Sequence, residues 1–279
     1  MNGLIVVNKE KGKTSRNIVN ELNIILGTKK IGHTGTLDPI ASGVLVCVIG
    51  KYTKLVNILV NDTKEYIAEI KLGISTDTLD ITGNIISTSI VDITKNDILK
   101  VFKYYKKSYL QEVPLYSSVH VNGKRLYDYA RSNVEVTSPK RKVTIYNLEL
   151  ISFNKDIVTF KVKVSKGTYI RSLIKDICNK LNIDGTMNNL IRIKQGNFTL
   201  EEAYKIEDIK NNNYKLLNIK EFLDYKVIEL PDNLINKVLN GNRINNIFNI
   251  DNRVIFTYKN KDIAIYEVDK KDLKPLIMF

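Results

Sequence analysis

Apolar and polar residues along the first fifty positions follow patterns that predict two strands and a helix. The run from Gly3 to Val7 is apolar throughout, which is typical of a buried strand. From Ser15 an apolar residue recurs every third or fourth position, which predicts a helix with Ser15 as its N-cap. A glycine-rich loop follows, and a second apolar run, Val44 to Ile49, predicts another buried strand.

The middle of the chain alternates between strand and helix patterns. Residues 64–73 alternate apolar and polar side chains, which predicts a strand half exposed to water. Two long alternating segments around Asn154-Lys155 predict a strand pair, and Asn122-Gly123 is a strong hairpin signal. The other predicted elements are a strand at 85–89, a helix opened by Thr94, a helix carrying Tyr127 and Tyr129, and a helix within 166–182.

The later part of the chain sets the predicted domain organisation. After Asn182 only short strand-like and helical pieces are predicted, and past about Glu221 the pattern becomes β-rich. We therefore predict a large domain at residues 1–222 and a small β-rich domain at residues 223–279. Paired antiparallel strands with helices between them favour an α+β fold, with a mixed, largely antiparallel sheet and flanking helices.

The chain is strongly basic. Its 279 residues include 43 Lys and Arg against 30 Asp and Glu, a formal net charge of +13. Such an excess favours a polyanionic partner, and nucleic acid is the first candidate. The alternative is a set of solvated lysine faces in a lysine-rich protein, and charge alone does not distinguish the two.

Cysteine and histidine are too few to indicate a disulfide scaffold or a histidine metal site. Cys47 lies in an apolar run and Cys178 in a helical pattern, so both are expected to be reduced core residues. His33 and His120 are the only histidines, and no metal is expected. The apolar run after Met1 is too short for a signal peptide or a membrane span, so a cytoplasmic location is expected by default.

The stretch VNKEKGKTS, residues 7–15, looks like a phosphate-binding P-loop but lacks one of its glycines. The P-loop pattern requires a glycine five positions before the Gly-Lys pair, and Val7 stands there. We therefore expect a turn that joins a strand to a helix, and no ATP or GTP.

The loop HTGTLDP, residues 33–39, places one carboxylate, Asp38, among Gly, Thr and Pro. Such an aspartate is a turn residue, a metal ligand, a general acid or a nucleophile. Taken alone, an Asp-Pro turn is the simplest interpretation. A metal is disfavoured because no second cluster of ligands accompanies Asp38 in the sequence.

Five stretches occur in one order along the chain: NGLIVVNKEKGKTS, GHTGTLDPIASGVL, KEYIAEIKLGISTDTLDITG, PLYSSVHVNGKRLYDYAR and SKGTYIRSLIKDI. Through them the chain resembles the bacterial tRNA pseudouridine synthase B family, from Asn2 to about Gly196. The C-terminal LNGNRI and DLKPLIMF resemble a small RNA-binding PUA-type domain. Three positions depart from the family pattern, with Glu10 for a proline, His120 for a lysine and Asn133 for a glycine.

The resemblance implies that the chain isomerises uridine 55 to pseudouridine in the T-arm stem-loop of tRNA, with Asp38 as the catalytic residue. This reaction breaks the N-glycosidic bond, turns the base and rejoins it through carbon, so it requires no redox change and no cofactor. It does require a carboxylate that acts as nucleophile or base, and a base flipped out of its stack.

The resemblance also implies which residues surround Asp38. Arg171 is expected to pair with the carboxylate, keep it ionised and fix its direction. The other implied roles are Tyr66 stacking on the base, Tyr169 packing near it, Leu190 lining the uracil pocket and His33 contacting the nucleotide near its phosphate. Each also has a plainer interpretation, as a strand tyrosine, a core leucine or a structural histidine. Lys9 is expected to support the loop.

Five tyrosines are interleaved with lysines and arginines: Tyr104, Tyr105, Tyr116, Tyr127 and Tyr129. Stacking on splayed bases would suit a T-loop, helix packing is the alternative, and a mixture of both is expected. The loop that carries Asp77 and Asp80 lacks the later bidentate Glu of an EF-hand, so we interpret it as a turn near the RNA entrance.

Three other functions stay open at this point. They are a tRNA-binding or folding factor, a guide-RNA-dependent pseudouridine synthase, and an aspartate-dependent hydrolase unrelated to RNA. The chain length and the first motifs favour the stand-alone enzyme. We expect a monomer with tRNA as its partner, no membrane contact and no obligatory protein partner.

Overall fold

The computed structural model describes residues 1–60, 63–132 and 134–279, so the departure at Asn133 lies outside the described residues. The strands are β1 (Gly3–Lys9), β2 (Ile31–His33), β3 (Ser42–Ile49), β4 (Lys64–Leu72), β5 (Ile74–Thr76), β6 (Ile85–Thr88), β7 (Ser108–Glu112), β8 (His120–Val121), β9 (Lys124–Arg125), β10 (Lys140–Asn154), β11 (Ile157–Val164), β12 (Gly185–Gln195), β13 (Phe198–Thr199), β14 (Lys226–Glu229), β15 (Ile244–Asn245), β16 (Arg253–Tyr258), β17 (Lys261–Asp269) and β18 (Asp272–Met278). The helices are α1 (Ser15–Ile25), the 3-10 helix η1 (Gly50–Leu55), α2 (Val56–Leu59), α3 (Lys95–Tyr105), α4 (Leu126–Arg131), α5 (Ile170–Leu181), α6 (Ile206–Lys210), α7 (Ile219–Phe222) and α8 (Asp232–Leu239).

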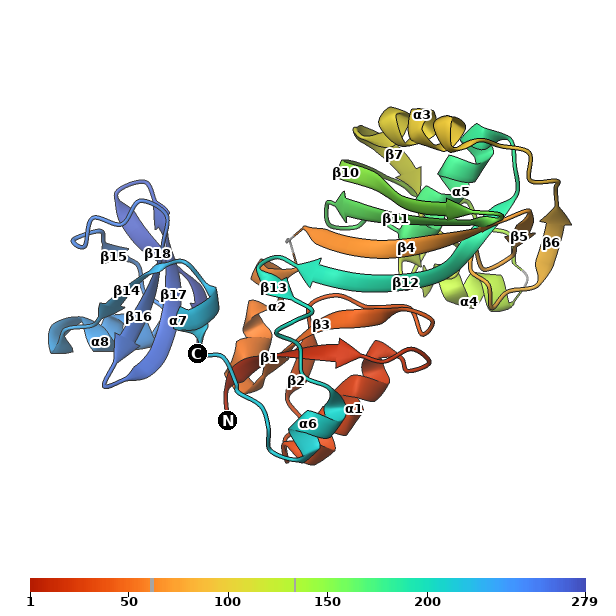
Figure 1. Cartoon of the computed structure of the whole chain (residues 1–279). Coiled ribbons are helices and arrows are strands. Elements are labelled where there is room, and N and C mark those ends of the chain that lie inside the picture. The colour runs from red at the N-terminus through yellow and green to blue at the C-terminus, as the bar shows by residue number, and fades with distance from the viewer. Residues whose placement is uncertain (61–62, 133) are drawn as a thin grey trace.

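A nine-stranded sheet forms the larger part of the molecule (Figure 1). Its main path runs β1-β3-β12-β4-β11-β10-β7, with β2 beside β3 and β13 beside β12. Every described pairing in it is antiparallel except that of β12 with β3. The predicted mixed, largely antiparallel sheet with flanking helices is therefore confirmed.

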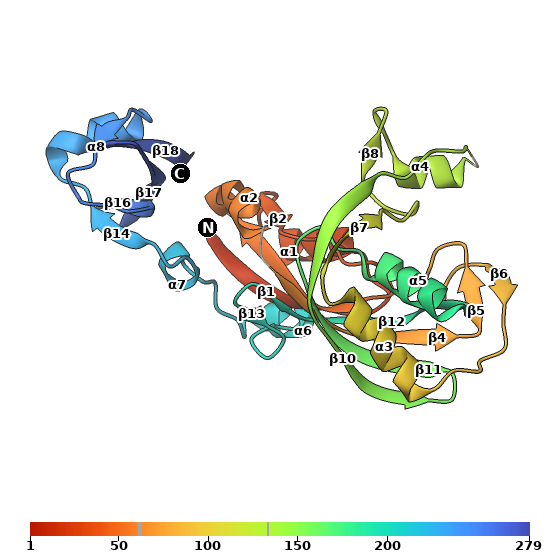
Figure 2. The same cartoon turned by 90° about the horizontal axis from the view of Figure 1, so that it is seen from above.

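Strand β4 shows why one face of this sheet is buried. Its side chains alternate between buried and half-buried along the whole strand, because successive side chains point to opposite faces. Helices α3 and α5 lie side by side over the buried face (Figure 2). Their apolar residues, among them Phe102 and Leu173, join those of β4, β11 and β12 in one core.

Strands β1 and β3 are covered on both faces, which explains their continuous apolar runs. On one face Ile5 and Leu45 pack with residues of α1 and α6. On the other face Leu4 and Val46 pack with η1 and with residues of the C-terminal part of the chain.

Two predictions about elements were wrong, and both errors involve polar residues that serve the tertiary structure. The N-cap of α1 is Thr14, whose hydroxyl accepts the Asn17 N–H at 3.0 Å. The Ser15 hydroxyl instead accepts the Leu37 N–H at 2.9 Å, 22 residues along the chain. After Asn182 the structure forms β12, an eleven-residue central strand whose pattern was hidden by buried polar residues.

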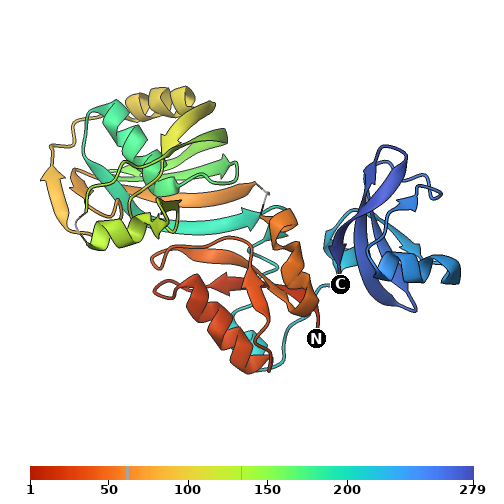
Figure 3. The same ribbon diagram turned by 180° about the vertical axis from the view of Figure 1, so that it is seen from behind.

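A second sheet, in the order β14-β16-β17-β18-β15, forms a small lobe at the C-terminal end with its own apolar core. Figure 3 shows this lobe, in blue, beside the N-terminus of the chain. The expected β-rich C-terminal unit is present, while the exact boundary between residues 222 and 223 stays a prediction.

The two cysteines, Cys47 and Cys178, are buried free thiols, as predicted. Burial raises the pKa of each thiol to about 12, so both stay protonated at neutral pH. Within the described ranges, no helix has the length and apolarity that a membrane crossing requires.

Candidate active site

Asp38 lies in the loop between β2 and β3, at the border of the main core. Its neighbours Leu37 and Ile40 are buried in that core, while the Asp38 side chain is 31% exposed. The Ala41 N–H donates to the Asp38 carbonyl at 3.0 Å and closes a turn. The loop is therefore anchored on both sides of Asp38, and the Asp38 carboxylate is still open to solvent.

Arg171, near the start of α5, forms a two-point ion pair with Asp38. Its Nε lies 2.9 Å from Oδ2, and its Nη2 lies 3.1 Å from Oδ1. The Arg171 side chain is only 6% exposed, and it also donates to the carbonyls of Thr78 and Tyr116 at 3.2 and 3.0 Å. A planar guanidinium with acceptors on several edges has one available orientation, so it fixes the direction of the carboxylate.

The Thr78 carbonyl is held by a turn at residues 76–83. Asp80 accepts hydrogen bonds from the Thr82 N–H and the Thr78 hydroxyl, both at 3.0 Å. The Leu79 carbonyl accepts the Met187 N–H of β12 at 3.2 Å, which attaches the turn to the sheet. This turn therefore supports Arg171, a role that its sequence did not indicate.

Lys9, at the end of β1, is completely buried and supports the far side of the loop. Its Nζ donates to the carbonyls of Glu10, Lys13 and Pro39 at 2.9, 2.6 and 3.4 Å. Burial lowers the pKa of Lys9 to about 8, although the nearby Asp38 carboxylate acts in the opposite direction. The turn that resembles a P-loop thus folds against the residue that follows Asp38.

Sequence reasoning did not single out Arg192 of β12, which is 1% exposed. Its Nε donates to the Val44 carbonyl at 2.7 Å, and its Nη2 donates to the Gly35 carbonyl at 2.9 Å. Arg192 is two residues from Leu190 in the same strand, so the period-two pattern puts both on one face. A charged residue is seldom fully buried without partners, so an arginine at an inward position of a strand pattern is the sequence signal that could have indicated Arg192.

Gly43 is required where the loop returns into β3. Its φ is +103°, and a Cβ there would lie 2.2 Å from the backbone oxygen of Arg192. Gly43 pairs with both Lys9 in β1 and Arg192 in β12, so three strands meet at this point. This glycine therefore lets the strands that anchor the Asp38 loop approach one another closely.

Tyr66 and Leu190 come from the neighbouring strands β4 and β12. Their side chains are 7% and 5% exposed, and both belong to the same core as Leu37 and Ile170. Since Leu37 precedes Asp38 and Ile170 precedes Arg171, this core adjoins the ion pair. The structure thus places Tyr66 and Leu190 in the core that adjoins the Asp38 loop, and their contacts with uracil stay predictions.

Tyr169 is the N-cap of α5, with an extended backbone at φ −101° and ψ 117°. The helix begins at Ile170, so Tyr169 and Arg171 do not lie together in one extended segment. Burial raises the pKa of the half-buried Tyr169, although Arg141 and Arg171 act in the opposite direction. The phenol therefore stays neutral at physiological pH.

His33 lies at the end of β2, paired with Cys47 of β3. Its Nδ1 accepts the Gly35 N–H at 3.4 Å. Burial, and then the charges of Arg192 and Arg16, lower the pKa of His33 below its usual value near 6.5. His33 is consequently neutral at pH 7, and it would contact a phosphate as a hydrogen-bond donor and not as a cation.

The five tyrosines are divided as expected between packing and exposure. Tyr105 is 9% exposed and belongs to the main core, whereas Tyr104 and Tyr127 are 47% and 41% exposed. Lys107 Nζ lies 3.6 Å from the centre of the Tyr104 ring, and the rings of Tyr116 and Tyr127 meet edge to face at 6.0 Å. Exposed rings beside cations are the part that suits nucleic acid.

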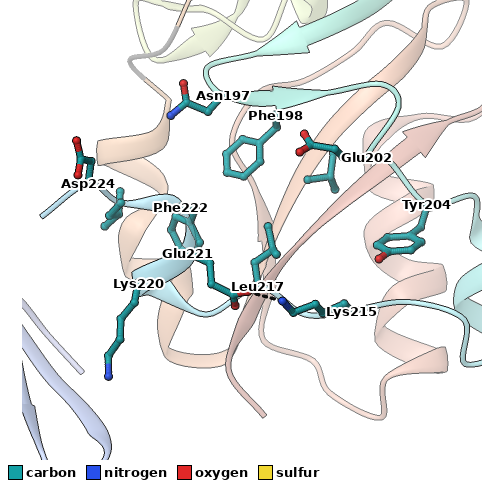
Figure 4. A pocket seen from close by; sticks show the side chains of 12 residues that line it. Asn197, Phe198, Glu202, Tyr204, Lys215, Leu217, Lys220, Glu221, Phe222 and Asp224 are labelled. Carbon is teal, nitrogen blue, oxygen red and sulfur yellow. Dashed lines mark hydrogen bonds and ion pairs between the residues drawn. The ribbon is translucent and has the colours of Figure 1, made fainter. Parts of the chain in front are cut away.

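A cavity of about 630 Å³ lies away from these residues, between β1, β13 and the segment around α7 (Figure 4). Its lining includes Phe198 and Phe222, with the Lys215–Glu221 ion pair at its side. Neither Asp38 nor Arg171 lines this cavity. The cavity is therefore separate from the Asp38 site. At the Asp38 site the carboxylate is reachable from solvent, the buried Arg171 guanidinium orients it, and aromatic and apolar residues lie behind it.

A comparison with protein families gives this geometry its context. The family model described as TruB family pseudouridylate synthase, N-terminal domain, matches residues 23–170. The chain belongs to the TruB family. It is 41% identical to the tRNA pseudouridine synthase B of Caldanaerobacter subterraneus subsp. tengcongensis, over 95% of this chain and 94% of that one. It is 39% identical to the tRNA pseudouridine synthase B of Clostridium tetani, over 97% and 93% of the two chains. This TruB-family chain is a pseudouridine synthase, as the resemblance implied.

Solved structures show the same fold over nearly the whole chain. A Cbf5-Nop10-Gar1 complex matches with a TM-score of 0.73 and 22% identity, over 99% of this chain and 84% of that one. An H/ACA RNP bound to a substrate RNA containing 2′-deoxyuridine matches over the same shares with a TM-score of 0.72 and 22% identity. At this level of identity the match establishes the architecture.

Proposed function

We propose that this TruB-family chain isomerises uridine 55 in the T arm of tRNA to pseudouridine, with Asp38 as its catalytic carboxylate. The observation that carries the proposal is the contrast within the ion pair, in which Asp38 is 31% exposed and Arg171 is 6% exposed. A carboxylate that acts on a nucleotide has to be reachable, whereas the cation that orients it has to be fixed. The relatives named tRNA pseudouridine synthase B support tRNA as the substrate.

The reaction is balanced without a cofactor. The bond from C1′ to N1 breaks, the bond from C1′ to C5 forms, the proton at C5 leaves, and N1 gains a proton. Asp38 acts on the target nucleotide as nucleophile or base, and Arg171 keeps it aimed. Tyr66 stacks on the uracil, Leu190 lines its pocket, Tyr169 packs beside it, and His33 donates a hydrogen bond near the phosphate.

The proposal assigns residues 1–222 to catalysis and residues 223–279 to a PUA-like domain that adds RNA contacts. The protein acts as a monomer in the cytoplasm on tRNA, without an obligatory protein partner. The formal charge of +13 supports a polyanionic substrate.

The test is incubation of the purified protein with unmodified tRNA, followed by chemical mapping of pseudouridine along the product. A single new pseudouridine at position 55 is expected, and tRNA binding is expected to weaken steeply as salt rises. Modification at another position would overturn the site assignment. Absence of any pseudouridine, together with tight tRNA binding, would favour a tRNA-folding factor instead.

A second candidate, guide-RNA-dependent synthesis, has one observation in its favour, which is the shared fold with the Cbf5 complexes. The discriminating substrate is an isolated T-arm stem-loop, incubated with the purified chain and no other RNA or protein. Turnover of this stem-loop is expected for the stand-alone enzyme. Turnover that requires an added guide RNA would establish the second candidate.

A further inference from the structure

Helix α5, which carries Arg171, begins without a cap from its own segment. Its N-cap residue, Tyr169, makes no side-chain cap hydrogen bond within the described part of the chain. The first N–H groups of a helix have no partner inside the helix, so an uncapped start costs stability and frays. Because Arg171 lies in the first turn of α5, fraying of this turn would move Arg171 relative to Asp38.

An acceptor for the first of these N–H groups comes from β7, 58 residues earlier in the chain. The Gln111 Oε1 accepts the Tyr169 backbone N–H at 2.8 Å. Gln111 is 1% exposed, so its side chain lies in the interior and makes this contact away from water. A buried amide would otherwise be costly, and it is retained here with both ends of its side chain engaged.

The other end of Gln111 leads back to the same helix. Its Nε2 donates to the Tyr109 hydroxyl at 2.8 Å, and that hydroxyl donates to Asp176 Oδ2 at 2.9 Å. Burial raises the pKa of both Tyr109 and Asp176, in keeping with the interior position of the chain of hydrogen bonds. Tyr169 and Asp176 both belong to the α5 segment, so the three side chains form a closed clamp between β7 and α5.

Arg171 lies between the two points at which this clamp, formed by Gln111, Tyr109 and Asp176, holds α5. The N-terminus of a helix repels a cation, so an arginine in the first turn depends on tertiary contacts for its position. Its guanidinium reaches Asp38 at 2.9 Å, a distance that a small shift of the first turn would lengthen.

We propose that Gln111, held in place by Tyr109 and Asp176, is a positioning residue that sets the first turn of α5 so that Arg171 meets Asp38 in register. This inference rests on the proposed function, in that it takes Asp38 and Arg171 as the groups whose geometry limits turnover. Among the hydrogen bonds of the described residues, those of Gln111 reach neither Asp38 nor the Arg171 guanidinium, so its effect is transmitted by the helix start.

The experiment compares two variants with a matched control. Gln111→Met removes the cap acceptor at similar length, and Tyr109→Phe removes one hydroxyl while keeping the ring. The control is Tyr105→Phe, because the Tyr105 hydroxyl also donates to Asp176, to its backbone oxygen at 2.9 Å, but does not lead to the N-cap. The measurements are kcat and KM on unmodified tRNA, tRNA affinity, and the unfolding midpoint in urea.

We expect kcat of Gln111→Met to fall about 10- to 100-fold, because small misplacements of catalytic groups cost rates of this order. Tyr109→Phe is expected to show a smaller fall in kcat, since Gln111 keeps its bond to the Tyr169 N–H. In both variants KM and tRNA affinity stay within about twofold, and Tyr105→Phe keeps the wild-type kcat although it loses a similar amount of stability.

Two outcomes would contradict the proposed positioning role of Gln111. One is an equal loss of kcat in Tyr105→Phe, which would show that any loosening around Asp176 has the same effect. The other is a change in KM or stability with kcat unaltered, in whichever of the two variants folds. An inactive wild-type protein would instead contradict the proposed function, and so the two failures are distinguishable.

Discussion

The Asp38 loop and the junction with the C-terminal lobe are both tied down by groups from distant parts of the chain, but by different forces. Around the loop, Lys9 and Arg192 are buried cations that donate to backbone carbonyls, and Arg171 donates to two more besides the Asp38 carboxylate. At the junction the contact is largely apolar, and residues of β1 and β3 share one core with Ile255 and Ile265.

Polar contacts also cross this largely apolar junction, among them those of Tyr52 in η1 and of Lys54, whose Nζ donates to the Met278 carbonyl at 2.6 Å. The Tyr52 hydroxyl donates to Asp262 Oδ2 at 2.7 Å and accepts the Ile219 N–H at 3.0 Å. The Tyr52 ring also lies against those of Phe222 and Phe279, with centroids 6.1 and 5.7 Å away. Tyr52 therefore connects η1, which follows β3, to the segment of α7 and to the lobe.

The difference between the Asp38 loop and the lobe junction shows that directional contacts are used where one group has to be placed accurately. Apolar burial is strong but non-directional, so it holds the lobe on the sheet without fixing the position of any one atom. Hydrogen bonds from buried cations are directional, and they set the position of the Asp38 carboxylate. Substitutions of the residues that hold the Asp38 loop should therefore lower kcat. Substitutions at the junction with the lobe should instead raise KM for full-length tRNA.

The largest expected effect follows Asp38→Asn, which keeps the shape of the side chain and removes its charge. We expect kcat to fall by about four orders of magnitude, because loss of a central catalytic group costs rates of this size. Affinity for tRNA should stay near wild type. The exposed Asp92→Asn, measured in the same mapping assay, is the matched control, and full activity in Asp38→Asn would contradict the assignment.

A smaller loss is expected for Arg171→Lys, which retains the charge but not the planar fork. One ammonium cannot replace two parallel bonds to Asp38 together with those to Thr78 and Tyr116, so kcat should drop about 10²- to 10³-fold. The split between kcat and KM checks this prediction. Wild-type kcat in the lysine variant would show that charge alone suffices.

Lys9→Met tests the other side of the loop and has a pH signature. We expect kcat to fall about tenfold, since the Pro39 carbonyl loses its tie. The pKa of Lys9 is lowered to about 8 from 10.5, so between these pH values the unfolded chain binds more protons than the folded one. Relative to Lys9→Met, the free energy of unfolding of the wild type should therefore rise as pH increases through this window.

Urea unfolding of both proteins at pH 7.5, 9 and 10 would measure that difference. The comparison cancels the titration of tyrosines common to both proteins. Parallel stability curves for the two proteins would mean that Lys9 keeps an ordinary pKa, and that its burial does not disfavour the charged form.

The smallest effect is expected at the junction, from Tyr52→Phe. Removal of one hydroxyl that pairs Asp262 with the Ile219 N–H costs about 1 kcal/mol, which corresponds to about fivefold in an affinity. We expect this as a rise in KM for full-length tRNA, with kcat unchanged and with no change for the isolated T-arm stem-loop. Equal effects on both substrates would show that the lobe does not act on the outer part of tRNA.

Much of the architecture followed from pattern, because it depends on local periodicity. The helix cap at Thr94, the Asn122-Gly123 hairpin and the alternating strands β4, β10 and β11 are all present where they were predicted. Strand β12 was not predicted, since three of its buried positions carry Thr186, Arg192 and Gln195, which read as exposed residues.

The candidate site likewise has residues that local motifs indicated and residues that they did not. Asp38 and Arg171 were recognised because each lies inside a dense local motif, and the structure brings them into contact. Ser15, Arg192 and Gln111 were missed, because a polar residue shows its role only through its partners. Those partners are 22, 157 and 58 residues away along the chain.

The sequence by itself determined the family and most of the elements, and it pointed to Asp38 as the candidate carboxylate, since these are written in contiguous stretches. Only the tertiary structure decided how the carboxylate is held. Buried polar groups are tolerated where their hydrogen bonds are completed. For Lys9 and Arg192 the completing atoms are backbone carbonyls brought together by folding, and for Gln111 they are the Tyr169 N–H and the Tyr109 hydroxyl. No pattern of neighbouring residues encodes those meetings, because they depend on the packing of β1, β7 and β12 around α5 and the Asp38 loop.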